Sequence, residues 1–144
     1  MKVRARILNL MGNRLSRETY LAERVFITGC GLTTEGNVSI NAGSHIDAAA
    51  SIFLGDGVRI ACGVMITTTT HLAGPPDLRA GETIRRSVSI GSGTWVGARA
   101  IILPGVNIAS GCIIGAGAVV AADTLPDGLY VGVPARRIKD LALS

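Results

Sequence analysis

Residues 90–125 read IGSGTW VGARAI ILPGVN IASGCI IGAGAV VAADTL, and each block of six begins with Ile or Val. The frame extends back by one block, so a step of six links Ile84, Ile90, Val96, Ile102, Ile108, Ile114 and Val120. The fourth position after each of these is small or β-branched, as at Val106 and Cys112. An α-helix repeats every 3.6 residues and a two-sided strand every two, so neither explains a period of six.

A triangular coil does explain this period. Each hexad supplies a short strand with its branched residue pointing inward, followed by a turn at which glycine or a small residue lets the backbone bend. Three hexads complete one coil, and successive coils stack as parallel strands about 4.8 Å apart. The composition of the 144 residues agrees, with 19 glycines and only 3% aromatic residues, because such a narrow prism has no room for rings. We therefore predict an all-β, parallel β-helical fold.

The repeat divides the chain into three parts. The β-helix is predicted for residues 36–125, in which Ile40, Ile46 and Ile52 keep the spacing of six in a shifted frame, and a loop at 72–83 interrupts it. Residues 1–35 form a basic segment with a first capping turn, and a helix that covers the first coil is predicted from Val3, Ile7, Leu10, Met11 and Leu15. Residues 126–144 are predicted to form a turn, a strand and a short helix from Arg136 to Leu143.

Positive charge is concentrated at the N-terminus. The first 24 residues hold six basic and two acidic residues and so carry the whole net charge of +4. Such a segment is either a solvated face or a contact for an anionic membrane surface or a phosphorylated ligand. The few aromatic residues are not interleaved with the basic ones, so no nucleic-acid partner is expected.

Location and redox state are also constrained by the sequence. No run of 18 apolar residues occurs, and the N-terminus lacks an apolar stretch followed by a cleavage site, so we expect a cytoplasmic protein. The three cysteines, Cys30, Cys62 and Cys112, lack the spacing of metal ligands and are expected to be small buried apolar residues.

The chain resembles the hexapeptide-repeat acyltransferases, which include galactoside, maltose and polysaccharide O-acetyltransferases. The resemblance covers residues 36–141 and rests on Leu54-Gly55-Asp56-Gly57-Val58, Thr67-Thr68-Thr69-Thr70-His71, Ile102-Leu103-Pro104-Gly105-Val106 and Gly132-Val133-Pro134-Ala135-Arg136. It implies a left-handed parallel β-helix and a homotrimer with active sites between neighbouring prisms. It also implies an acyltransferase that moves an acetyl group from acetyl-CoA to a hydroxyl of a sugar or glycan.

The resemblance makes His71 the general base of this reaction. Imidazole is suited to the task because it titrates near neutral pH. No activated Ser–His or Cys–His pair can be identified, which favours direct attack of the hydroxyl on the thioester. His45, the other histidine, is expected at the surface. Zinc enzymes on the same β-helix, the gamma-class carbonic anhydrases, use three histidines, so no metal is expected here.

The resemblance also assigns binding residues. Asn41 occupies the place of an asparagine that contacts the acceptor sugar, and Asp47 lies just before the family's acceptor-binding aspartate, whose place Ala48 and Ala49 take here. Coenzyme contacts are implied for Trp95, for the backbone at Gly97, Ala98 and Ala116, and for the cations Arg136, Arg137 and Lys139. Ala121 and Ala122 stand at a cofactor-binding position where many members have Thr-Lys.

Several alternatives remain open from the sequence. Asn41 is equally a turn residue, and packing between subunits is the alternative role for Trp95. N-acetylation of an amino sugar, acetylation of an antibiotic and a noncatalytic β-helix scaffold are the competing functions. A thioester-cleavage assay with acetyl-CoA separates the scaffold from the enzymes.

Overall fold

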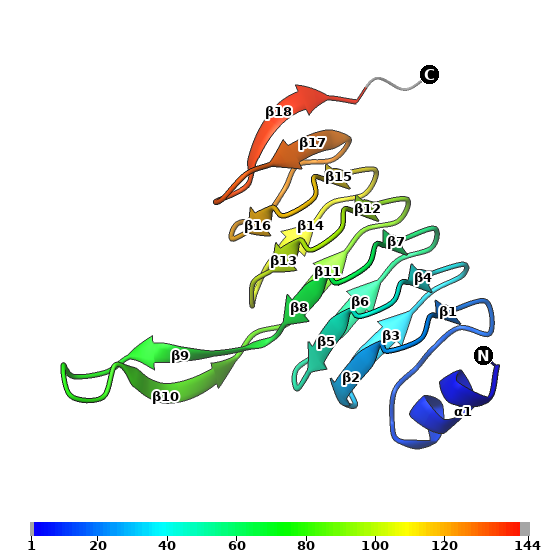
Figure 1. Ribbon diagram of the computed structural model, residues 1–144, viewed down its shortest axis with the longest axis horizontal. Coiled ribbons are helices and arrows are strands. Elements are labelled where there is room, and N and C mark those ends of the chain that lie inside the picture. Colours follow the sequence, from blue (N-terminus) through cyan, green and yellow to red (C-terminus); the bar gives the residue numbers. More distant parts are fainter. Residues whose placement is uncertain (1, 142–144) are drawn as a thin grey trace.

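The chain winds into a three-sided coil of short parallel strands in the computed structural model, which describes residues 2–141 (Figure 1). Face 1 consists of β1 (Tyr20–Leu21), β4 (Ser39–Ile40), β7 (Arg59–Ile60), β12 (Trp95–Val96), β15 (Ile113–Ile114) and β17 (Gly128–Val131). Face 2 consists of β2 (Phe26–Gly29), β5 (His45–Ala48), β8 (Met65–Thr67), β13 (Ile101–Ile102) and β16 (Val119–Val120). Face 3 consists of β3 (Leu32–Thr34), β6 (Ile52–Leu54), β11 (Val88–Ile90) and β14 (Asn107–Ile108). The chain visits the faces in this order in each full coil, so the predicted prism is confirmed.

The core is a set of aliphatic ladders inside this prism. The ladder of face 1 stacks Ile40, Ile60, Val96 and Ile114, and that of face 2 stacks Ile46, Ile66, Ile102 and Val120, all of them buried. Four aromatic side chains, Tyr20, Phe26, Phe53 and Trp95, are exposed on the outside. Tyr130 is the buried exception: it lies in the last coil, where its hydroxyl accepts a hydrogen bond from the backbone N–H of Leu125.

The shifted frame of the early repeats has a simple cause in β6. Ile52 and Leu54 both point inward from this strand, so the spacing of six passes from one to the other there. The pairing shows the result: Ile40 pairs with Ile60, twenty residues on, whereas Ile102 pairs with Val120, eighteen residues on. The early coils are longer than the later ones.

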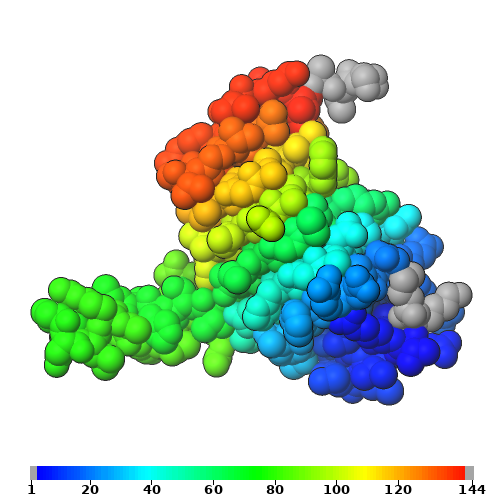
Figure 2. Space-filling view, viewed as in Figure 1, coloured from blue at the N-terminus to red at the C-terminus, as the bar shows by residue number. Residues whose placement is uncertain are grey.

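The predicted loop at 72–83 is a protruding arm (Figure 2). It is an antiparallel hairpin of β9 (Thr69–Ala73) and β10 (Ala80–Arg85), which leaves the prism between β8 on face 2 and β11 on face 3. The excursion is longer than expected, and Ile84 pairs with Thr70 inside the arm. The assignment of Ile84 to the core ladder was therefore wrong, and the inward frame resumes at Val88 and Ile90.

The N-terminal boundary at residue 36 was also placed too late. Strands β1, β2 and β3 already form a full coil that pairs in parallel with the next one. Before this coil comes α1 (Lys2–Leu10), which covers its open end in Figure 1. The helix packs through Ala5 and Leu8 rather than through the predicted stripe of Val3, Ile7, Leu10 and Met11, which is exposed. Leu15 lies beyond the helix and is buried in the core.

The C-terminal helix predicted from Arg136 to Leu143 is wrong. Residues of this segment form β18 (Arg136–Asp140), which runs antiparallel to β17, while residues 142–144 lie outside the described part of the chain. The last parallel strand would otherwise leave its backbone donors and acceptors unpaired, and β18 satisfies them. None of the helices in residues 2–141 is long and apolar enough to cross a membrane.

Candidate active site

His71 lies on β9, at the base of the arm and exposed to solvent. Its Nδ1 is 3.0 Å from the carbonyl oxygen of Gly81 and 3.4 Å from Oγ1 of Thr83, both on the facing strand β10. A carbonyl oxygen only accepts, so Nδ1 carries the proton and donates it. Nε2 is then left with a free lone pair, which is what a general base requires.

Asp47 anchors the strand that carries His71. One carboxylate oxygen, Oδ2, accepts hydrogen bonds from Oγ1 of Thr67 at 3.2 Å, from the N–H of Thr68 at 3.3 Å and from the N–H of Thr69 at 3.1 Å. The other, Oδ1, accepts one from the N–H of Ala49 at 3.3 Å. Partial burial favours a raised pKa for Asp47, but the hydrogen bonds from Thr69, Ala49, Thr67 and Thr68 outweigh it and lower the pKa.

These threonines belong to the motif that ends in His71, but sequence reasoning did not predict their hydrogen bonds to Asp47. Thr67 pairs with Asp47, twenty residues earlier in the neighbouring coil. Thr68 is fully buried, and its hydroxyl donates to the carbonyl oxygen of Asp47 at 2.9 Å. The run of threonines is visible in the sequence, but its pairing with Asp47 can be predicted only when the length of this coil is known.

The coenzyme candidates gather along a different edge, where face 1 turns into face 2. Trp95 projects from β12 with 53% of its surface exposed, next to Ile113 of the following coil. The turns after β12 and β15 place Ala98 and Ala116 one coil apart, because Val96 pairs with Ile114. We call this column the 1/2 edge, and Asn41, directly after β4, lies on it as well.

The backbone amides on the 1/2 edge are not equivalent. The N–H of Gly97 donates to the carbonyl oxygen of Ile114 at 2.7 Å, so this amide is used between the coils. The N–H groups of Ala98 and Ala116 have no backbone acceptor among the described residues. A Cβ atom on Gly97 would lie 2.7 Å from the nitrogen of Ala116, so only glycine permits this close stacking of the two turns.

The C-terminal cations lie at the upper end of face 1. Arg136 pairs with Val131 and Lys139 with Leu129, and both cations are exposed. Arg137 behaves differently, because its guanidinium donates to Asp140, to the hydroxyl of Tyr130 and to the carbonyl oxygens of Leu125, Pro126 and Asp127. The hydrogen bonds to Tyr130 and Asp140 raise the pKa of Arg137. Its predicted phosphate contact stays a prediction, one that these internal contacts do not favour.

One chain does not bring the predicted catalytic and coenzyme residues together. His71 and Asp47 belong to the opposite edge, where face 2 turns into face 3, and Ala121 and Ala122 lie on this 2/3 edge two coils above the arm. The whole of face 2 separates it from the 1/2 edge with Asn41, Trp95, Ala98 and Ala116. The described chain alone therefore does not assemble these predicted residues into one site.

Two remaining predictions concern His45 and the three cysteines, which are not part of the candidate site. His45 is exposed and rests against Phe26, with ring centroids 6.4 Å apart, as expected of a surface residue. Cys112 is buried as predicted, but Cys30 and Cys62 are exposed, which corrects the expectation for these two. Within residues 2–141, no three His, Cys, Asp or Glu side chains cluster as metal ligands would.

Comparisons with known proteins identify the family of this chain. The family model described as bacterial transferase hexapeptide (six repeats) matches residues 87–122. The crystal structure of a maltose O-acetyltransferase from Clostridium difficile 630 is 30% identical with a TM-score of 0.87, over 97% of this chain and 75% of that one. The chain belongs to the hexapeptide-repeat acetyltransferase family. Its β-helix is accordingly left-handed, as the resemblance implied.

Two further relatives define the type of acetyltransferase. The galactoside O-acetyltransferase of Escherichia coli (strain K12) is 29% identical over an alignment of 139 residues that covers 87% of this chain and 68% of the relative. A galactoside acetyltransferase solved in complex with coenzyme A is 25% identical with a TM-score of 0.78, over 98% of this chain and 80% of that one. The chain spans 44% of the length of two other curated relatives. It is an acetyl-CoA-dependent O-acetyltransferase of the galactoside/maltose type.

Proposed function

We propose that this acetyltransferase transfers the acetyl group to a hydroxyl of a sugar or glycan, with His71 as the general base. The observation that carries the proposal is the hydrogen bond from Nδ1 of His71 to the carbonyl oxygen of Gly81. This bond fixes both the tautomer and the orientation of the ring, so that Nε2 is free to accept a proton.

The proton balance is complete with this one side chain. Nε2 of His71 takes the hydroxyl proton as the acceptor oxygen attacks the thioester carbon, and the C–S bond then breaks. The imidazolium returns the proton to the departing sulfur, so the neutral histidine is restored. The free N–H of Ala98 or of Ala116 donates to the negative charge that develops on the carbonyl oxygen.

The separation of the two edges supports a site shared between chains in a homotrimer. The 1/2 edge of one subunit would supply Trp95, Ala98 and Ala116, and the arm of its neighbour would supply His71. Arg136 and Lys139, on the strand β18 that closes the upper end of face 1, would hold the phosphates of the coenzyme. Such head-to-tail contacts join unlike surfaces and close into a ring when the rotation permits.

Asn41 and Asp47 are the two residues predicted to contact the acceptor. Asn41 lies on the 1/2 edge, where its amide can both donate to and accept from sugar hydroxyls. Asp47 already accepts four hydrogen bonds from its own chain. We therefore assign the acceptor chiefly to Asn41 and keep Asp47 as a residue whose main role is to position the arm.

The test is a screen of sugar acceptors in which acetyl-CoA cleavage is followed by release of the free thiol. We expect His71→Ala to lower kcat by about 10²–10⁴-fold, the usual contribution of a general base, while thermal stability is unchanged. His45→Ala is the matched control, since it removes the other exposed histidine, and its kcat should equal that of the parent. Near-normal turnover of His71→Ala would contradict the assignment.

A further inference from the structure

Helix α1 turns an apolar stripe toward solvent. Val3, Ile7, Leu10 and Met11 follow the spacing of one helix face, and 67%, 52%, 89% and 64% of their surfaces are exposed. The opposite face, with Ala5 and Leu8, packs on the first coil. The stripe is therefore a surface with no partner in the described chain, although the helix itself is fixed in place.

The helix is anchored firmly enough to present this stripe in one orientation. The guanidinium of Arg4 donates to the carbonyl oxygen of Ala22 at 2.8 Å and also to that of Val25. The side chain of Asn9 exchanges two hydrogen bonds with the backbone of Leu15, at 3.0 and 2.7 Å. These contacts connect both ends of α1 to the first coil.

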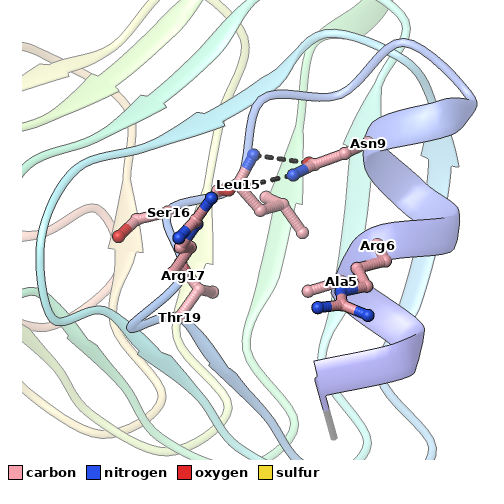
Figure 3. Close-up of a pocket in the computed structure, with 7 residues that line it drawn as sticks. All are labelled: Ala5, Arg6, Asn9, Leu15, Ser16, Arg17 and Thr19. Atoms are coloured by element: carbon pink, nitrogen blue, oxygen red, sulfur yellow. Dashed lines mark hydrogen bonds between the residues drawn. The ribbon is translucent and has the colours of Figure 1, made fainter.

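A cationic pocket of about 410 Å³ lies beside the stripe, between α1 and the segment that leads into the first coil (Figure 3). Arg6 and Asn9 line it from the helix, and Ser16, Arg17 and Thr19 line it from the facing segment. No carboxylate lines the pocket, and neither arginine has a salt-bridge partner in residues 2–141. Arg6 follows Val3 by three residues and precedes Leu10 by four, so it borders the stripe directly.

We propose that α1 and this pocket dock on an anionic lipid surface. The stripe of Val3, Ile7, Leu10 and Met11 inserts at the boundary of head groups and acyl chains, and Arg6 and Arg17 bind lipid phosphates. An anionic bilayer offers apolar and negative surface side by side, which matches this arrangement. A two-fold contact with a second copy of the chain matches it less well, because it would set Arg6 and Arg17 against like charges.

Docking in this orientation leaves the candidate active site accessible. The stripe lies at the N-terminal end of the stack, before β1, whereas Trp95 lies in the fourth strand of face 1 and Ala116 in the coil after it. The acetyltransferase would thus work close to a membrane with its grooves open to solvent. Such a location suits acceptors that are themselves attached to lipid.

The test is co-sedimentation of the full chain with vesicles of phosphatidylcholine alone and with about 30 mol % phosphatidylglycerol. We expect binding only to the anionic vesicles, weakened at high salt because exposed charges are screened. Each arginine near an anionic surface contributes roughly a fivefold factor, so Arg6→Gln with Arg17→Gln should weaken binding about 25-fold. Ile7→Gln with Leu10→Gln should weaken it at least tenfold.

Matched control variants change the same chemistry elsewhere on the surface. Arg86→Gln with Arg99→Gln removes two exposed arginines, and Leu125→Gln with Ile138→Gln removes two exposed apolar residues at the other end of the prism. Both controls should bind anionic vesicles like the parent. Circular dichroism melting shows whether each variant is folded, and a second charge variant, Arg6→Lys with Arg17→Lys, should retain most of the binding.

Three results would overturn the proposal. The first is equal binding of the parent to neutral and anionic vesicles, or binding to neither. The second is saturable binding of inorganic phosphate with no vesicle binding, which would show a free-phosphate site instead. The third is a change of oligomeric state in Ile7→Gln with Leu10→Gln, measured by analytical ultracentrifugation, which would show that the stripe joins copies of the chain.

Discussion

Replacing Asp47 tests whether its hydrogen bonds hold the arm that carries His71 in position. In Asp47→Asn the amide oxygen can keep the three hydrogen bonds from Thr67, Thr68 and Thr69, but the amide nitrogen then faces the N–H of Ala49 and that bond is lost. The remaining bonds also lose the strength that a charged acceptor gives them. We expect the free energy of unfolding to fall by about 1–2 kcal/mol in Asp47→Asn and by about 2–4 kcal/mol in Asp47→Ala.

The dependence on pH follows from the sign of the pKa shift. The pKa of Asp47 is lowered in the folded protein from its ordinary value of 3.8. The folded state therefore binds this proton less readily than the unfolded state, and the stabilisation is complete above the unfolded pKa and lost as the pH falls through the folded one. The difference in stability between the parent and Asp47→Asn should be constant near neutral pH and shrink below about pH 4.

Activity separates a positioning role for Asp47 from a direct contact with the acceptor. If Asp47 orients the strand that bears His71, Asp47→Asn lowers kcat and leaves the KM for the acceptor unchanged. A direct contact would instead raise that KM. Asp56→Asn is the matched control, because Asp56 also accepts a backbone hydrogen bond between coils, from the N–H of Asn37 at 2.7 Å, but lies outside the arm.

The decisive comparison uses thermal melting and steady-state kinetics on the same preparations. Asp56→Asn should lose stability with an unchanged kcat, whereas Asp47→Asn should lose both. If Asp47→Ala kept the parental melting temperature and kcat, the hydrogen-bond reasoning would be refuted.

Two further predictions concern the coenzyme end and the core. Arg136→Ala with Lys139→Ala should raise the KM for acetyl-CoA about tenfold in the thiol-release assay with little change in melting temperature, since loss of phosphate contacts weakens binding rather than folding. Arg137→Ala should instead lower the melting temperature with little change in the KM for acetyl-CoA, because the guanidinium of Arg137 holds the turn at 125–127. An unchanged melting temperature would contradict this role. In the core, Ile102→Ala should lower the free energy of unfolding by about 2–5 kcal/mol in chemical denaturation, since it leaves a cavity between Ile66 and Val120.

The ladder residues were predictable because the same position of every hexad faces inward in the stacked coils. Val96 and Ile114 follow from that rule alone, and both are fully buried. The rule says nothing about where a coil is interrupted, so Ile84 satisfied the spacing and yet belongs to the arm. The bulky inward residue also changes position in the hexad at β6, where Ile52 and Leu54 both face inward.

The ends of the prism were predicted less well, because their structure depends on partners far along the chain. The residues of β18 have a spacing compatible with a helix, but the open edge of β17 offers hydrogen bonds that a helix could not use. Likewise, the spacing of Val3, Ile7, Leu10 and Met11 predicted a helix without showing which face it buries. In the candidate site, the motif singled out the side chain of His71, whereas the partner of that side chain is the backbone carbonyl of Gly81, which no side-chain motif reveals.

The separation of the two edges explains why a prism of such short strands suits an enzyme that joins two substrates. The 1/2 edge is a rigid column of turns, with the free N–H groups of Ala98 and Ala116 held one coil apart. The proposed base, His71, lies on an arm that leaves the prism after β8 and contributes no residue to the ladders. On the proposed function, each groove combines the rigid column of one subunit with the arm of the next. Coenzyme binding and the position of the proposed base can then change independently, because different edges of the same coil determine them.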